Sequence, residues 1–206
     1  MTGLRIADVH VRCTVLGPGT RFVVWVQGCP LSCRECVSPQ WIPAGGGELA
    51  DVGELADRVV REAADGLTVS GGEPFAQADA VAELIRRVRE QRDLSVMAYS
   101  GFTLEHLRRH GTPGQRRLLD SLDILVDGPY LPERHADLRW RGSANQHLHL
   151  LTGRHAAPAD DRGAGLQVEV TAEGLVQWLG VPPTAGFRGR FEAVLGRPRP
   201  TERRQS

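Results

Sequence analysis

The sequence contains no lysine: all 25 basic residues are arginine, and 25 acidic residues balance them. A formal net charge of zero gives the chain no general attraction to phosphate backbones, which disfavours nucleic acid as a partner. The opening residues, MTGLRIADVH, lack the basic start and apolar stretch of a signal peptide, and the longest apolar run, residues 22–26, is too short to cross a bilayer. We therefore expect a cytoplasmic protein with no membrane partner.

Cysteine is also scarce, and its distribution is uneven. Of the four cysteines, Cys29, Cys33 and Cys36 fall within eight residues of one another. In a reducing compartment such a group indicates metal binding rather than disulfide bonds. The fourth, Cys13, stands apart, and we interpret it as a small core residue on or near an N-terminal strand.

The CxxxCxxC spacing of the grouped cysteines favours an iron–sulfur cluster. Such clusters bind Cys thiolates, normally four, so three ligands leave one iron open for substrate chemistry, as the open position of a catalytic zinc does. A structural zinc site and three incidental thiols are the alternatives. Structural zinc usually has four ligands, commonly in two CxxC-type pairs, but no second pair exists here, and neither His10 nor Cys13 has motif spacing.

The apolar patterns of the chain predict alternating strands and helices. We expect strands at residues 22–26, 67–69, 94–98 and 124–126, and helices at residues 49–64, 76–90 and 104–120, the last broken near residues 111–114. Leu49 begins the apolar face of the first predicted helix. This alternation is typical of an α/β fold with a parallel sheet covered by helices.

The length of 206 residues suits one domain with a sizeable core, which we assign to residues 1–155. Residues 156–196 form a predicted C-terminal extension, in which a linker or long loop over residues 156–165 precedes a β-hairpin. The hairpin strands are expected at residues 166–170 and 175–178. Residues 197–206 lack apolar periodicity and are expected to be a disordered tail.

Glycine-rich or polar residues follow each of the four predicted core strands. They are residues 27–29, 70–74, 99–101 and 127–129. Because ligands bind at the carboxyl ends of strands in parallel α/β folds, these four loops predict one binding site at a single edge of the sheet.

Five motifs together give the sequence a specific resemblance. CxxxCxxC after a strand resembles the radical S-adenosylmethionine superfamily, and SGGEP at residues 70–74 is similar to its GGEP motif. GPGTR, YSGFT and VDGP followed by RGSANQ resemble the activating proteins of anaerobic ribonucleotide reductase, which are glycyl-radical-enzyme activases; these motifs occupy residues 17–21, 99–103, 126–129 and 141–146. The match runs through residues 12–152 and implies an incomplete parallel α/β barrel with a small C-terminal hairpin.

The resemblance implies a [4Fe-4S] cluster on Cys29, Cys33 and Cys36, whose open iron binds S-adenosylmethionine. The residues expected to contact S-adenosylmethionine are Glu35, Cys36, Val37, Gly71, Gly72, Glu73, Pro74, Tyr99, Ser100 and Asp127. Gly71 and Gly72 would let the backbone approach the ligand, and Glu73 would anchor its loop. Asp127 either touches the ligand or caps a turn.

Two positions depart from the pattern that the resemblance implies. Glu35 stands where the superfamily often has an aromatic or small residue against adenine, and a Lys that related activases of pyruvate formate-lyase carry is absent. A contact made by that Lys must therefore be missing or made by Arg.

Arg141, Asn145 and Gln146 either shape the mouth for radical transfer or hold the closing loop.

The function implied by the resemblance is reductive cleavage of S-adenosylmethionine to a 5′-deoxyadenosyl radical, which generates a glycyl radical on a partner enzyme. The implied partners are a glycyl radical enzyme and an electron donor such as flavodoxin or ferredoxin. One alternative keeps this chemistry but modifies a peptide or a small metabolite. Another is a non-catalytic iron–sulfur electron carrier, although a closed cluster would require a fourth ligand.

Overall fold

The computed structural model describes residues 2–172, 174 and 176–195, and its centre is a seven-stranded sheet with the order β3-β1-β2-β4-β5-β6-β9. The four central strands are parallel: β2 (Arg21–Val26), β4 (Gly66–Gly71), β5 (Ser95–Tyr99) and β6 (Ile124–Asp127). The antiparallel neighbours are β1 (Gly3–Cys13), β3 (Glu48–Asp51) and β9 (His147–Leu150). The fold is therefore mixed α/β, and the four predicted parallel strands are confirmed.

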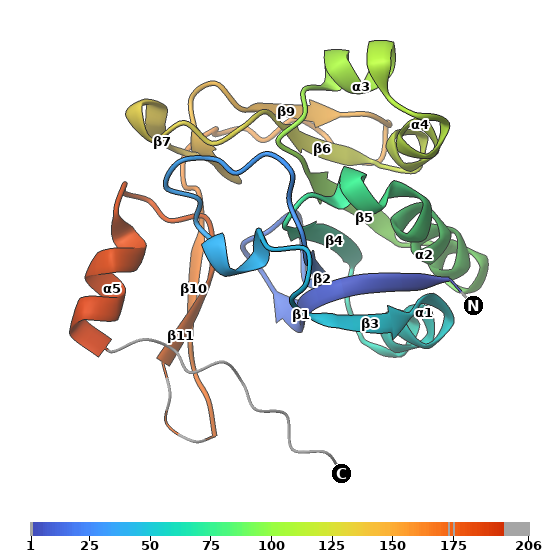
Figure 1. Cartoon of the computed structure of the whole chain (residues 1–206), viewed down its shortest axis with the longest axis horizontal. Coiled ribbons are helices and arrows are strands. Elements are labelled where there is room, and N and C mark those ends of the chain that lie inside the picture. Colours follow the sequence, from blue (N-terminus) through green and yellow to red (C-terminus); the bar gives the residue numbers. More distant parts are fainter. Residues whose placement is uncertain (1, 173, 175, 196–206) are drawn as a thin grey trace.

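Helices cover one face of this sheet. They are α1 (Val52–Arg61), α2 (Ala78–Gln91), α3 (Leu104–His110) and α4 (Pro113–Asp120), and α1, α2 and α4 stack along one side of the strands in Figure 1. Apolar stripes on these helices meet every second strand residue, including Val24, Val69 and Leu125, in the main core. Among the described residues, no helix is long and apolar enough to cross a bilayer.

The first helix begins later than the sequence predicted. The Asp51 carboxylate accepts hydrogen bonds from the Gly53 and Glu54 amides, so it caps the helix and fixes its start at Val52. Residues 48–51 pair instead with β1, and Leu49 is 65% exposed rather than on an apolar helix face. The break predicted near residues 111–114 of the third helix is confirmed. It separates α3 from α4, which begins at a capping box formed by Thr112 and Gln115.

Smaller elements complete the chain. They are the 3₁₀ turns η1 (Pro39–Trp41), η2 (Pro74–Gln77) and η3 (Pro132–Arg134), the pair β7 (His135–Leu138) and β8 (Arg141–Ser143), the hairpin β10 (Leu166–Val170) and β11 (Val176–Gly180), and α5 (Phe187–Leu195). The predicted hairpin is confirmed, and β1 is the N-terminal strand expected near Cys13, although its bounds were not predicted. β7, β8, β9 and α5 were not predicted as elements. The predicted tail, residues 197–206, lies outside the described residues.

The hairpin and α5 lie on the opposite side of the sheet from α1, α2 and α4 (Figure 1). Leu179 and Val181 pack against the second core cluster, which includes Trp25 and the fully buried Cys13 at the end of β1. The predicted core role of Cys13 is thus confirmed. Trp178 packs on Phe187 of α5, with ring centroids 5.2 Å apart.

A buried arginine closes the amino ends of the parallel strands. Arg21 is fully buried, and its guanidinium donates to Thr68 Oγ1 at 3.0 Å, Ser95 Oγ at 2.5 Å and the Leu67 carbonyl at 2.7 Å. Burial lowers the pKa of Arg21 to about 10, so it stays charged at neutral pH. A Cβ at Gly66 would lie 2.6 Å from the Ser95 carbonyl oxygen, which explains why glycine begins β4. The four loops lie at the opposite ends of these strands, the carboxyl ends.

Candidate functional site

Backbone hydrogen bonds hold the start of the cysteine loop where β2 ends. The Gly28 amide donates to the Trp41 carbonyl at 2.8 Å, and the Cys29 amide donates to the Ile42 carbonyl at 3.0 Å. Trp41 also packs on Trp25 of β2, with ring centroids 5.5 Å apart. The loop that carries the thiols is therefore closed on itself before the first cysteine.

Two left-handed residues curl this loop between its cysteines. Ser32 has φ 46° and directly precedes Cys33, while Glu35 has φ 55° and directly precedes Cys36. Left-handed residues of this kind occur in the concave backbone turns that bind anions and iron–sulfur clusters. Two non-glycine left-handed residues within four positions strain the backbone, and such strain is concentrated at ligand-binding sites.

The three thiols are free and partly buried, and backbone amides face two of them, Cys33 and Cys36. Burial raises the pKa of both Cys33 and Cys36, while a backbone amide of Tyr130 lowers that of Cys33 and one of Ser38 lowers that of Cys36. Without metal the thiols of Cys33 and Cys36 therefore stay protonated at neutral pH. When a metal binds, the same backbone amides would donate to thiolates.

The three thiols of this loop do not lie close enough together to share a single metal ion. The three sulfur atoms of this loop are not among the ligand groups whose atoms all lie within 4.8 Å of one another in the described part of the chain. Sulfurs around one tetrahedral zinc, at about 2.3 Å from it, would lie roughly 3.8 Å apart. The chemistry of this donor set, three free thiols on one loop, fits an iron–sulfur cluster, which binds Cys thiolates.

The GGEP loop, residues 71–74, is bonded directly to the cysteine loop. The Gly72 amide donates to the Val26 carbonyl at 2.7 Å, and the Glu73 amide donates to the Gly28 carbonyl at 2.9 Å. A Cβ at Gly72 would lie 2.2 Å from the Gly28 carbonyl oxygen, and one at Gly71 would lie 2.5 Å from the Val26 backbone. Both glycines are therefore needed for contact between the two loops, whatever they contribute to a ligand.

Glu73 joins the GGEP loop to the loop after β5. Its side chain is 1% exposed and accepts hydrogen bonds from the Phe75 amide at 2.9 Å, the Ser100 hydroxyl at 3.0 Å and the Gly101 amide at 2.8 Å. The predicted anchoring role is confirmed. Burial raises the pKa of Glu73 to about 7, and the three donors oppose that rise.

The remaining predicted contact residues lie on different faces of the sheet. Tyr99 lies on the face away from the helices, where its hydroxyl is buried without a hydrogen-bond partner among the described residues. Asp127 lies on the helix side and accepts a hydrogen bond from the Leu104 amide at the start of α3. This bond is a long-range contact with another element and not the turn cap that sequence analysis considered for Asp127. The contact of Asp127 with a ligand stays a prediction.

The RGSANQ segment holds the closing loop against the end of β6. Gln146 accepts hydrogen bonds from the Gly142 and Ser143 amides and donates to the Gly128 carbonyl at 3.0 Å. Asn145 donates to the Pro129 carbonyl at 2.8 Å, and Arg141 donates to the Gln146 carbonyl at 3.3 Å. Of the two roles expected for this segment, loop closure is the one these contacts support.

The carboxyl ends of β2, β4, β5 and β6 thus meet in one connected site, as the sequence predicted. Comparison with known proteins then decides the family. The family model described as "4Fe-4S single cluster domain" matches residues 15–149. The anaerobic ribonucleoside-triphosphate reductase-activating protein of Vibrio cholerae is 37% identical over 150 residues, which cover 67% of this chain and 92% of that protein.

This chain belongs to the anaerobic ribonucleoside-triphosphate reductase-activating protein family. The Haemophilus influenzae member is 33% identical over 144 residues, covering 65% of this chain and 89% of its own. The Escherichia coli K12 member is 29% identical over 148 residues, which cover 66% of this chain and 92% of that protein. The hairpin and α5 lie beyond the residues that the family model matches.

This part of the chain beyond the family match packs on the cysteine loop. A cavity of about 210 Å³ is lined by Glu35, Cys36 and Val37 on one side and by Phe187 and Arg188 of α5 on the other. Arg188 donates to the Val37 carbonyl at 2.8 Å and to Gln40 Oε1 at 2.7 Å. Sequence analysis missed Arg188 because nothing near it in the chain signals a contact about 150 residues away.

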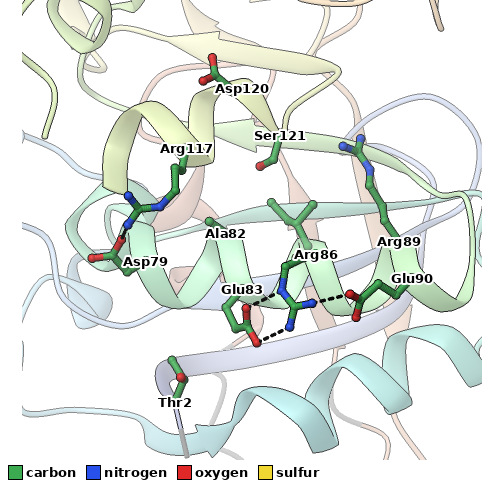
Figure 2. Close-up of a pocket in the computed structure, with 11 residues that line it drawn as sticks. Thr2, Asp79, Ala82, Glu83, Arg86, Arg89, Glu90, Arg117, Asp120 and Ser121 are labelled. Atoms are coloured by element: carbon green, nitrogen blue, oxygen red, sulfur yellow. Dashed lines mark hydrogen bonds and ion pairs between the residues drawn. The ribbon is translucent and has the colours of Figure 1, made fainter. Parts of the chain in front are cut away.

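A larger hollow on the helix side of the protein is lined mainly by charged residues. It has about 870 Å³ and runs between α2 and α4, remote from the cysteines, and Figure 2 shows its charged lining. Arg86 pairs there with Glu83 and Glu90, and Arg117 pairs with Asp79. Because these charges satisfy one another at an exposed surface, we assign the functional site to the smaller cavity at the cysteine loop.

Replacing Glu73 tests the protonation of the buried carboxyl. Because the pKa of Glu73 is about 7 in the folded protein and near 4.5 when exposed, the folded state holds the proton more tightly. The carboxyl therefore contributes stability at low pH that is lost as pH rises from about 4.5 to about 7. The difference in free energy of unfolding between wild type and Glu73→Gln should fall by roughly 3 kcal/mol across this window.

Urea denaturation under anaerobic conditions at equal iron content, from pH 5 to pH 8, measures this difference. The exposed Glu54, changed to Gln, is the matched control, and its difference from wild type should be flat. Parallel curves for wild type and Glu73→Gln would contradict the assigned protonation.

Replacing Arg188 tests whether α5 protects the cysteine loop. Arg188→Met removes the bonds to Val37 and Gln40, so the cover over Cys36 should open more often. Loss of about 1 kcal/mol of hydrogen bonding predicts roughly fivefold faster loss of cluster absorbance in air. Arg190→Met, on the same helix but bonded to Thr184, is the control and should keep the wild-type rate; equal rates for all three proteins would rule out a protective α5.

Proposed function

We propose that this protein activates an anaerobic ribonucleotide reductase by generating a glycyl radical on it. The observation that carries the proposal is the joining of the three-cysteine loop to the GGEP loop at one edge of a parallel sheet. The relatives named as reductase-activating proteins supply the partner. In this proposal the sheet is an incomplete barrel of the radical S-adenosylmethionine type, with core residues 1–155 and an extension over residues 156–196.

The cofactors are a [4Fe-4S] cluster and S-adenosylmethionine. Cys29, Cys33 and Cys36 would hold three irons and leave the fourth for the amino and carboxylate groups of S-adenosylmethionine. When bound, the cluster supplies one electron that breaks a carbon–sulfur bond of the sulfonium, giving methionine and the 5′-deoxyadenosyl radical, which takes a hydrogen atom from glycine. A small cytoplasmic donor such as flavodoxin or ferredoxin would supply the electron that reduces the oxidised cluster again.

The residues of this chain position the cofactor. In this proposal Gly71, Gly72 and Pro74 present the loop backbone toward the methionine amino group. Glu73 fixes that backbone by accepting hydrogen bonds from the Phe75 and Gly101 amides. The segment of Glu35, Cys36 and Val37 forms the wall for the adenine side.

The other predicted contacts come from the loops after β5 and β6. Tyr99 and Ser100 flank the ribose, and the Asp127 carboxylate lies near the methionine carboxylate in this proposal. The Ser100 hydroxyl already donates to Glu73, so its contribution is chiefly through the backbone. No lysine is available, so the contact that a lysine makes in related activases would be absent or made by an arginine.

The radical must reach the partner through an open edge. A chain of this size cannot enclose a large reductase, so a loop bearing the glycine would enter the site. With zero formal net charge, docking should depend little on salt.

A second candidate keeps the radical chemistry and changes the substrate to a peptide or a small metabolite. It is favoured by α5, which lies outside the family match and lines the cavity beside Cys36. A small substrate would fit a cavity that the chain itself covers.

Electron paramagnetic resonance distinguishes the two candidates. Reduced protein, S-adenosylmethionine and a co-encoded reductase, mixed without oxygen, should give the doublet of a glycyl radical. The doublet should vanish when the partner's radical glycine is changed to Ala, or when Cys33 of this chain is changed to Ala. Cleavage of S-adenosylmethionine with no radical on the reductase, and a mass change in a co-encoded peptide, would favour the second candidate instead.

A further inference from the structure

Two histidines of the edge strand β9 lie on the same side of the sheet as Asp127. Strand residues alternate between faces, so His147 and His149 point to one side while Leu148 and Leu150 pack into the third core cluster on the other. In the antiparallel register His147 lies directly opposite Asp127 of β6. The pattern His-x-His on one strand and a carboxylate on the next brings three metal-ligating side chains to the helix side of the sheet.

Both imidazoles lie about as far from the carboxylate as two ligands of one metal ion lie from each other. His147 Nδ1 lies 3.4 Å from Asp127 Oδ1, and His149 Nε2 lies 3.1 Å from Asp127 Oδ2. One ligand atom from each residue lies within 4.8 Å of the others. A tetrahedral ion with bonds of about 2.0–2.2 Å to nitrogen and oxygen separates its ligands by roughly 3.3–3.6 Å.

Two of these atoms are buried without a hydrogen bond. The Asp127 side chain is 3% exposed, and neither its Oδ1 nor His149 Nε2 has a hydrogen-bond partner among the described residues. The 3.1 Å approach of the imidazole to Oδ2 is thus close but is not a hydrogen bond. Meanwhile the Leu104 amide donates to Oδ2 and orients the carboxylate, as outer-shell donors do at metal sites.

We propose that Asp127, His147 and His149 bind one divalent transition-metal ion, separate from the cluster. Two imidazoles and a carboxylate suit zinc or ferrous iron, whereas the three thiolates suit the iron–sulfur cluster. The ion satisfies both orphaned atoms and joins edge strand β9 to β6 and to the start of α3. His147 is 68% exposed, so the remaining coordination position opens to solvent.

This site does not rest on the proposed activase function. Asp127 is common to both proposals and also accepts a hydrogen bond from the Leu104 amide at the start of α3, so the histidines are the residues to change. The competing interpretation is that one histidine is protonated and forms an ion pair with Asp127, with no metal bound.

The test is calorimetric titration of zinc into cluster-loaded protein under anaerobic conditions, with iron counted before and after. Wild type should bind one zinc per chain without losing iron, and zinc should raise its unfolding temperature. The double variant His147→Ala/His149→Ala should bind zinc at least about tenfold more weakly and lose the temperature shift.

A second histidine pair provides the matched control. His106 and His110 lie on α3 with ring centroids 5.5 Å apart, and His106→Ala/His110→Ala removes the same number of imidazoles. This variant should bind zinc as wild type does, and the single variant His147→Ala, at an exposed position, should repeat the loss without a folding defect. Zinc binding that survives in the first double variant, falls equally in the control, or is absent from wild type overturns the proposal.

Discussion

The contact between Gly72 and Gly28 is the constraint on which the rest of the site depends. It brings the backbones of the cysteine loop and the GGEP loop so close that a Cβ at Gly72 would lie 2.2 Å from a carbonyl oxygen. Glu73 then extends the connection to the loop after β5 through its buried carboxylate. Because the thiols and the predicted cofactor contacts share one backbone framework, a shift in either loop moves both.

Local signals in the sequence predicted this framework well. Glycine and proline after each buried apolar run located the loops. Those within residues 111–114 located the break between α3 and α4, where the structure shows the capping box of Thr112 and Gln115. The start predicted for the first helix is wrong. The spacing of Leu49 fits the apolar period of that helix, but Leu49 lies before the capping residue Asp51 and is exposed. The side to which Asp127 points could not be predicted, since it depends on the register of a strand whose pairing with β9 is not local.

Long-range packing explains the other omissions. The hairpin was predictable from its own residues, but its docking on the core through Leu179 was not. The same holds for α5, which Trp178 and Phe187 fix and whose Arg188 reaches the cysteine loop. These elements lie beyond the family match, so they distinguish the surroundings of the cluster in this chain from what the family residues alone provide.

The central claim is that three cysteines hold a cluster with one iron open to S-adenosylmethionine. The most direct test is electron paramagnetic resonance of the reduced, anaerobically reconstituted protein, recorded with and without S-adenosylmethionine. The account predicts a [4Fe-4S] signal, from about four irons per chain, whose g-values shift when S-adenosylmethionine binds the open iron. A signal that S-adenosylmethionine leaves unchanged, or one retained in full by Cys33→Ala, would contradict it.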